Sequence, residues 1–319
     1  MEVNKDEQQH KPVLLEEVLE ALSIVEDGLY IDCTFGRGGH SRAMLKQLGN
    51  QGRLLAIDRD PYAIQAGKML ESEDPRFSIE QGAFSALKTI TDQKGITGKV
   101  NGILFDLGVS SPQLDDAERG FSFMREGPLD MRMDPDHAQS AAEWLATAAE
   151  REMVQVFSDY GEERFSKRIA RAIVVTREET PIETTKQLAE LISEVTPDMS
   201  KPGQKSIHPA TRVFQAIRIV INEELDEIKK VLDQALDVLA PGGRLAVISF
   251  HSLEDRIVKR FMKKAAAGDD FPRELPIPAS MMNPTMTIIG KMIKTGKEEL
   301  AENPRSRSAV LRVAEKVAT

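Results

Sequence analysis

Strand-like and helical segments alternate along the first third of this 319-residue chain, and this alternation strongly constrains the fold. Short apolar runs at 29–35, 53–57, 77–79 and 100–107 are separated by stretches with apolar residues at helical spacing. Strands joined through helices are typical of a parallel sheet that is covered on both faces. We therefore predict a doubly wound, mostly parallel α/β core of the Rossmann-like kind.

This alternation stops after the fourth strand. Residues 114–212 contain helical patterns but no convincing strand; the best helices are Ala141–Phe157, Glu163–Thr176 and Thr184–Val195, and Lys201–Pro209 is predicted to be a loop. The α/β pattern then returns with one long amphipathic helix at Val213–Leu239, a strand at Arg244–Phe250, a helix opened by a capping box at Ser252–Asp255, and a last strand at Ser308–Val313. The predicted organisation is a core of residues 1–113 and 213–319 with an inserted all-helical domain at 114–212.

Composition limits the possible partners and compartments. The formal net charge is −9, so a nucleic-acid partner must be met by a local basic patch. A single cysteine, Cys33, excludes an internal disulfide and most cysteine-based metal sites. The polar stretch Met1–His10 has no signal-peptide core, and no apolar run is long enough to span a membrane. These features predict a cytoplasmic protein.

The first chemical motif is the loop between the first strand and the next helix. Gly36, Gly38 and Gly39 let the backbone pass close to a ligand, but their spacing is not the dinucleotide pattern G-x-G-x-x-G. Asp32 precedes the loop and would favour a ligand with an ammonium group over a pyrophosphate. The arrangement resembles the first motif of methyltransferases that use S-adenosylmethionine (AdoMet), although an ordinary strand-to-helix turn is the alternative.

Three further residues stand where a doubly wound fold binds ligands. Asp58 closes the second strand, where a carboxylate can accept hydrogen bonds from ribose hydroxyls, or where it could simply cap a helix. Phe84 follows the third strand and could lie against an adenine or belong to the core. Asp106 ends the fourth strand before a loop at Leu107–Gln113. Amino-methyltransferases place an acceptor there for the target amine, so Asp106 is the catalytic candidate; a solvent-capped strand end is the alternative.

Basic residues gather in three segments, which is consistent either with solvated helix faces or with a phosphate-bearing partner. The RNA-contact candidates are Arg164, Lys167, Arg168, Arg171, Arg256, Lys259, Arg260, Arg305 and Arg307. The histidines have no spaced partners of the kind that bind metals, so no metal is expected, and a local hydrogen bond is the default for His208 and His251.

Several longer motifs together resemble one family, the bacterial ribosomal RNA small subunit methyltransferase H family. The resemblance extends from near the first residue to near the last and is carried by His10–Leu14, Thr34–His40, Asp106–Gln113, Arg119–Phe123, Leu129–Met133, His208–Arg212, Phe250–Arg256 and Asn303–Ser308.

The resemblance implies methylation of the exocyclic N4 of a cytidine, conventionally position 1402, in the 16S rRNA of the small ribosomal subunit, with no obligate protein partner evident. It also implies AdoMet contacts at Gly38, Gly39, His40, Asp58, Phe84, Asp106 and Gln113. We expect the inserted domain to recognise the RNA. Asp106 thus has two assignments: the resemblance gives it to AdoMet, and the chemical argument gives it to the target amine. Both can hold where the cofactor site meets the substrate site.

Three other classes of protein remain as alternatives. A nicotinamide-dependent dehydrogenase is disfavoured by the absent G-x-G-x-x-G and by Asp32. A methyltransferase acting on a small molecule is disfavoured by the basic segments, whereas the residue spacing does not exclude one acting on DNA. A non-catalytic assembly factor that binds rRNA is the third.

Overall fold

The computed structural model describes residues 12–136, 139–197, 208–269 and 282–318. The chain forms two compact units: residues 1–108 with 225–319 make an α/β core, and residues 109–224 make a helical unit. The sequence pattern had placed these boundaries at 113/114 and 212/213.

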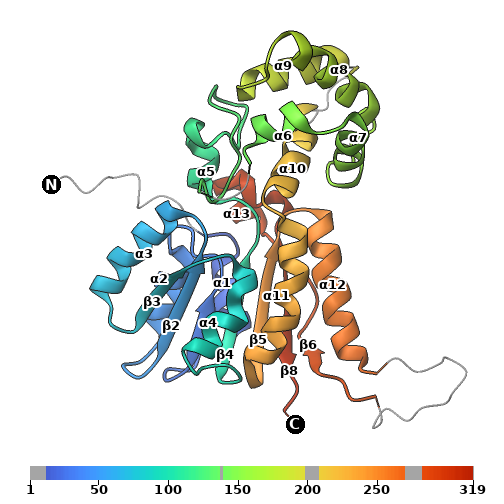
Figure 1. Ribbon diagram of the computed structural model, residues 1–319. Coiled ribbons are helices and arrows are strands. Elements are labelled where there is room, and N and C mark those ends of the chain that lie inside the picture. The colour runs from blue at the N-terminus through green and yellow to red at the C-terminus, as the bar shows by residue number, and fades with distance from the viewer. Residues whose placement is uncertain (1–11, 137–138, 198–207, 270–281, 319) are drawn as a thin grey trace, which may run out of the picture. The chain divides into compact units, whose positions relative to one another are not determined.

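A single sheet runs through the α/β core in the order β3-β2-β1-β4-β5-β8-β6, with β7 also beside β8 (Figure 1). The five strands from β3 to β5 in this order are parallel to their neighbours. β8 runs antiparallel to β5, and both β6 and β7 run antiparallel to β8. The predicted doubly wound, mostly parallel sheet is therefore confirmed. The strands are β1 (Leu29–Asp32), β2 (Arg53–Asp58), β3 (Phe77–Gln81), β4 (Val100–Asp106), β5 (Leu239–Ser249), β6 (Met286–Ile288), β7 (Ile293–Lys294) and β8 (Val310–Lys316).

Helices cover both faces of this sheet. Successive strand residues point to opposite sides, so each face carries apolar side chains that a helix can bury. Tyr30, Leu54 and Leu104 share one apolar core with α1 (Leu15–Leu22), α2 (Gly39–Gln47) and α3 (Pro61–Glu73). The other face carries α4 (Leu87–Gln93), α11 (Glu224–Val238) and α12 (Ser252–Ala267) (Figure 1). Short elements complete this unit: η2 (Phe84–Ala86), α13 (Lys297–Glu302) and η5 (Pro304–Ser308).

The helical unit has no strand among its described residues, apart from an isolated bridge between Pro128 and Thr184. The prediction of a helical insertion is confirmed. Its elements are α5 (Ser111–Asp115), η3 (Ala117–Arg119), α6 (Ala141–Thr147), α7 (Glu150–Asp159), α8 (Ser166–Glu179), α9 (Thr185–Val195) and α10 (Ala210–Ile221). The motifs Arg119–Phe123 and Leu129–Met133 are joined in its interior. The buried Arg119 guanidinium donates to the carbonyls of Arg132 (3.1 Å) and Met133 (2.9 Å).

The single long helix predicted at 213–239 is wrong, since the chain breaks between α10 and α11. Asn222 is buried, and its amide donates to Met131 O (2.8 Å) while its oxygen accepts from Met133 N (2.8 Å). Glu223 then adopts a left-handed backbone, with φ of 51°. The apolar spacing continues across the break, so periodicity alone could not reveal it: Ile217 and Ile221 serve the core of the helical unit, whereas the residues after Glu224 serve the α/β core.

Smaller differences also have local causes. The predicted helix 141–157 is two helices, because Ala149 has an extended backbone and is the N-cap of α7. The capping box of α12 begins one residue earlier than predicted, with His251 rather than Ser252 as the N-cap. β6 and β7 are too short to stand out in the sequence. Most of the predicted loop 201–209 lies outside the described residues. Within the described ranges, no helix is both long and apolar enough to cross a membrane.

Candidate active site

Three carboxylates end three neighbouring parallel strands and therefore meet at one edge of the sheet. Asp32 ends β1, Asp58 ends β2 and Asp106 ends β4. β1 lies between β2 and β4, so the strand order reverses direction there. In doubly wound folds this switch point is where ligands bind. The structure thus brings together the acidic residues that the sequence singled out.

Asp32 orders the glycine loop and the start of α2. The side chain is 1% exposed, and it accepts hydrogen bonds from Ser41 Oγ (2.7 Å) and Thr34 N (3.1 Å). Burial raises the pKa of Asp32, although His40, Ser41 and Thr34 oppose the rise. These bonds hold the Asp32 carboxylate in place within the protein. Direct contact between Asp32 and a cofactor stays a prediction.

The glycines are required by the backbone of the loop. Gly36 and Gly38 have positive φ values of 57° and 76°, and Gly38 is the N-cap of α2. A side chain on Gly39 would place its Cβ 2.4 Å from Pro12 Cγ. The protein itself therefore requires glycine at these positions, and the loop brings backbone N–H groups to the N-terminus of α2.

Asp58 is joined to the same loop. Its Oδ2 accepts from Gly36 N (2.8 Å) and its Oδ1 from Asp60 N (2.9 Å). Burial raises the pKa of Asp58 to about 6, and these two hydrogen bonds limit the rise. Each oxygen keeps acceptor capacity after these bonds, so the carboxylate is held in place and can still bind hydroxyl groups.

Asp106 faces His40 across the switch point. The Oδ2 atom of Asp106 lies 3.7 Å from Nδ1 of His40, whose Nε2 is 3.1 Å from the carbonyl of Val13. Burial raises the pKa of Asp106 to about 6; His40 lowers it, and Asp32 and Glu254 raise it. The backbone N–H of Asp106 donates to Thr34 Oγ1 (2.7 Å), which ties β4 to the glycine loop.

This geometry assigns one proton of the pair to Nε2 of His40. A carbonyl can only accept, so Nε2 of His40 carries a proton and donates it to Val13. The contact between Nδ1 and Oδ2 is attractive only if a second proton lies on one of these two atoms. The other oxygen of Asp106, Oδ1, is buried and makes no hydrogen bond to the described residues. It is therefore an acceptor in need of a donor.

Phe84 lies at the start of η2, beside the edge defined by the acids. Its ring is half-buried, packs edge-on against Phe105 at 5.9 Å, and has the Arg59 guanidinium 5.7 Å from its centroid. The ring is therefore fixed by the protein on two sides. Gln113 belongs to the helical unit, where it is buried and accepts from Ser110 N (2.9 Å).

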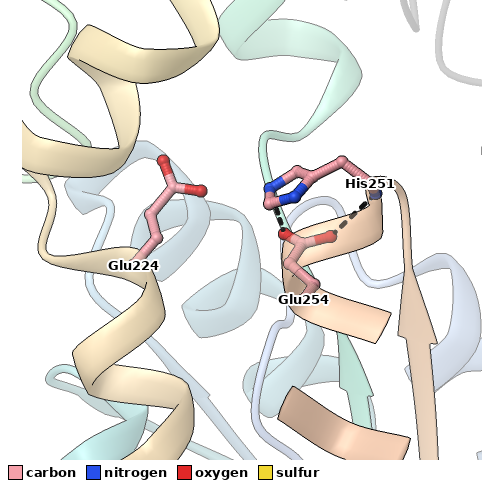
Figure 2. Close-up of side chains that lie close together, drawn as sticks. All are labelled: Glu224, His251 and Glu254. Atoms are coloured by element: carbon pink, nitrogen blue, oxygen red, sulfur yellow. Dashed lines mark hydrogen bonds and ion pairs between the residues drawn. The ribbon is translucent and has the colours of Figure 1, made fainter. Parts of the chain in front are cut away.

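His251 and Glu254 follow β5 at the same carboxyl edge of the core (Figure 2). Glu254 is fully buried, and its Oε2 accepts from the backbone N–H groups of Phe250 (2.7 Å) and His251 (3.2 Å). The His251 imidazole lies 3.2 Å from Oε1 of Glu254. Glu224, the third residue drawn, is bound in the helical unit by Arg218 at 2.7 Å.

The basic candidates all lie on the protein surface. The exposed side chains belong to α8 and the turn before it, to α12, and to η5: Arg164, Lys167, Arg168, Arg171, Arg256, Lys259, Arg260, Arg305 and Arg307. Arg171 pairs with Glu150 at 3.2 Å, so its charge is partly balanced. The structure thus leaves these residues available for contact, and their role stays a prediction.

Sequence reasoning missed two residues that organise the site. Thr34 accepts from Asp106 N, and Ser41 donates to Asp32. Both stand in or beside the glycine loop. The bond of Thr34 depends on the pairing of β1 with β4, which no local pattern reveals. The bond of Ser41 is local and joins the start of α2 to the end of β1.

Comparison with known proteins gives one match over nearly the whole chain. The family model described as the MraW methylase family matches residues 7–317. Among solved structures, a proposed rRNA-methylase from Clostridium thermocellum has 10% identity and a TM-score of 0.44, covering 97% of this chain and 98% of that one. An rRNA methylase from Streptococcus thermophilus has 10% identity and a TM-score of 0.42, with coverages of 95% and 93%. A proposed methyltransferase from Streptococcus mutans, in complex with SAH, has 13% identity and a TM-score of 0.40, with coverages of 95% and 97%.

Proposed function

The chain belongs to the MraW methylase family, and from this premise we propose that it methylates the exocyclic N4 of cytidine 1402 in 16S rRNA. Membership makes the protein an AdoMet-dependent rRNA methyltransferase. The proposal adds the target atom, the target nucleotide and the small ribosomal subunit as partner.

The glycine loop and the acids around it fit AdoMet. AdoMet supplies an electrophilic methyl group when it is bound. We assign the ribose hydroxyls to Asp58, whose oxygens are fixed by backbone N–H groups yet keep acceptor capacity. Phe84 is proposed to support the adenine, and Gly38, Gly39 and His40 to lie along the rest of the cofactor. Gln113 is proposed as a further contact from the family resemblance, and Asp32 as the residue that orders the loop.

The unpaired Oδ1 of Asp106 is the observation that carries the amine assignment. Cytosine N4 is a poor nucleophile because its lone pair is delocalised into the ring. A buried carboxylate oxygen that accepts one N4–H would localise this pair and direct it to the methyl group. His40 and Thr34 hold Asp106 in place for this role. The proton that N4 loses can then pass to the carboxylate that already faces it.

RNA recognition is assigned to exposed basic residues in both units. The helical unit offers the cluster from Arg164 to Arg171, and the core offers α12 and η5. We propose that these surfaces bind the phosphates of the small-subunit rRNA, and that the protein acts in the cytoplasm. The rRNA substrate class and the overall negative charge support local basic surfaces over a uniformly basic protein.

A direct test is mass spectrometry of nucleosides from small-subunit rRNA, in strains with and without this protein. We expect N4-methylcytidine at the target position to disappear in the strain that lacks it. Restoring the wild-type chain should bring the modification back. An unchanged N4-methylcytidine signal would refute the assignment of the target and would favour a methyltransferase with a different rRNA target.

A further inference from the structure

A cationic hollow lies at the outer edge of the α/β core, beside β8. β6, β7 and the turn that joins them pair with β8, and α12 packs against β6. Between α12 and this ribbon is a hollow of about 50 Å³. Four cations line it: Lys259 and Lys263 of α12, Lys291 of the turn, and Arg312 of β8.

The charge around the hollow is not balanced by its lining. No carboxylate lines it, and among the described residues none forms an ion pair with Lys259, Lys263 or Lys291. Arg312 is different, because Asp255 holds its guanidinium through two hydrogen bonds of 2.6 and 3.1 Å. Three exposed lysines thus line one hollow of a chain whose net charge is −9. Such a local excess favours a polyanionic partner.

Apolar side chains stand between these cations. Ile288 is 42% exposed and Met292 is 47% exposed. The hollow has room for only a few water molecules, so it cannot enclose a nucleobase. A ligand must therefore lie across the surface, with its anionic groups at the lysines and its less polar parts on the aliphatic side chains.

We propose that this hollow, with Lys259, Lys263 and Lys291, is a docking surface for the sugar–phosphate backbone of rRNA. The inference rests on the proposed function, because the rRNA substrate gives the class of the partner. An acidic peptide fits less well: β6 has only three residues, a short edge for strand addition. Phosphate contacts fix the register of an RNA without reading its sequence, so this surface positions the substrate and leaves the choice of base to the active site.

The test compares rRNA affinity at several salt concentrations for two full-length variants with equal charge. K259Q/K263Q/K291Q removes the three lysines of the hollow, and K46Q/K68Q/K99Q removes three exposed lysines elsewhere in the core. Each single-strand phosphate contact contributes about 0.7 to the slope of log K against log salt. We therefore expect the first variant to lose a slope of about 2, which is an affinity loss of about 100-fold at roughly 0.1 M relative to 1 M salt. The control should keep the wild-type slope.

Two further measurements separate the possible outcomes. Calorimetric titration with AdoMet should give wild-type affinity for both variants, and Lys291→Gln alone, on an exposed turn, should lose a slope of about 0.7. An unchanged slope for the triple variant on transcribed small-subunit rRNA overturns the proposal. So does normal binding to this transcript with weakened binding to assembled subunits, because that result assigns the surface to a ribosomal protein. If the wild-type protein formed no N4-methylcytidine, the proposed function would be refuted. The salt slopes would still report on rRNA binding at this surface.

Discussion

Replacing Asp106 by asparagine should make the protein more stable and less active. Burial raises the pKa of the Asp106 carboxyl from 3.8 to about 6, with His40 opposing the rise. A rise of about two units corresponds to about 3 kcal/mol of destabilisation at neutral pH. Because the side chain is 26% exposed, solvent screening reduces our expectation to about 2 kcal/mol. Asparagine removes this cost with little change in shape.

The sign of the pH dependence follows from the raised pKa. The folded state binds the proton more tightly than the unfolded chain, so wild-type stability falls as pH rises from about 4 to about 6. The gain in unfolding free energy of Asp106→Asn over the wild type should therefore grow over this pH range and stay constant above it. For a core of this size, 2 kcal/mol raises the melting temperature by about 4–8 °C.

Thermal unfolding at about pH 4 and pH 8, together with methyl transfer to transcribed rRNA, checks this prediction. We expect the variant to lose about 100-fold in turnover while it gains stability at the higher pH. Asp233→Asn, at an exposed position of α11, is the matched control and should change neither quantity. Wild-type turnover in Asp106→Asn, or no gain in stability at pH 8, would show that the reasoning about this carboxylate is wrong.

Two other substitutions test the cofactor site and the helical unit. Asp58→Ala should weaken AdoMet binding by about 10–100-fold, because the ribose hydroxyls lose a charged acceptor; calorimetry measures this, and unchanged affinity would remove Asp58 from the site. Asn222→Ala should destabilise the helical unit by about 3 kcal/mol, since Met131 O and Met133 N lose their buried partner. Urea unfolding measures the loss, and a change below about 1 kcal/mol would contradict the role given to Asn222.

The parts of the fold that sequence could predict depend on local chemistry. The alternation of apolar runs and helical stretches gave the parallel strands, and the ends of those strands gave Asp32, Asp58 and Asp106 as neighbours. A parallel sheet brings the carboxyl ends of its strands to one edge, so strand order within the core was not needed to group these acids. The glycine loop was recognisable because few other residues tolerate its backbone.

The parts that escaped prediction depend on contacts between distant segments. Asn222 ends α10 because Met131 and Met133, some ninety positions earlier, supply its hydrogen-bond partners. Thr34 matters only because β4 pairs beside β1. The β6–β7 ribbon is recognisable as sheet only through its pairing with β8. Hydrophobic periodicity carries no record of such partners, and it ran without interruption across the break at Asn222.

The hydrogen bond from His40 to the Val13 carbonyl has a consequence for mutational scanning. Every substitution at position 13, proline included, leaves a backbone carbonyl in place, so a scan there reports only on side-chain packing in the core. The chemical contribution of this position would be invisible to such an experiment. Removal of the segment before α1 is a different perturbation: it takes the Val13 carbonyl away from Nε2 of His40, so the imidazole that faces Asp106 loses its acceptor. An N-terminal truncation and a point substitution at the same place therefore answer different questions.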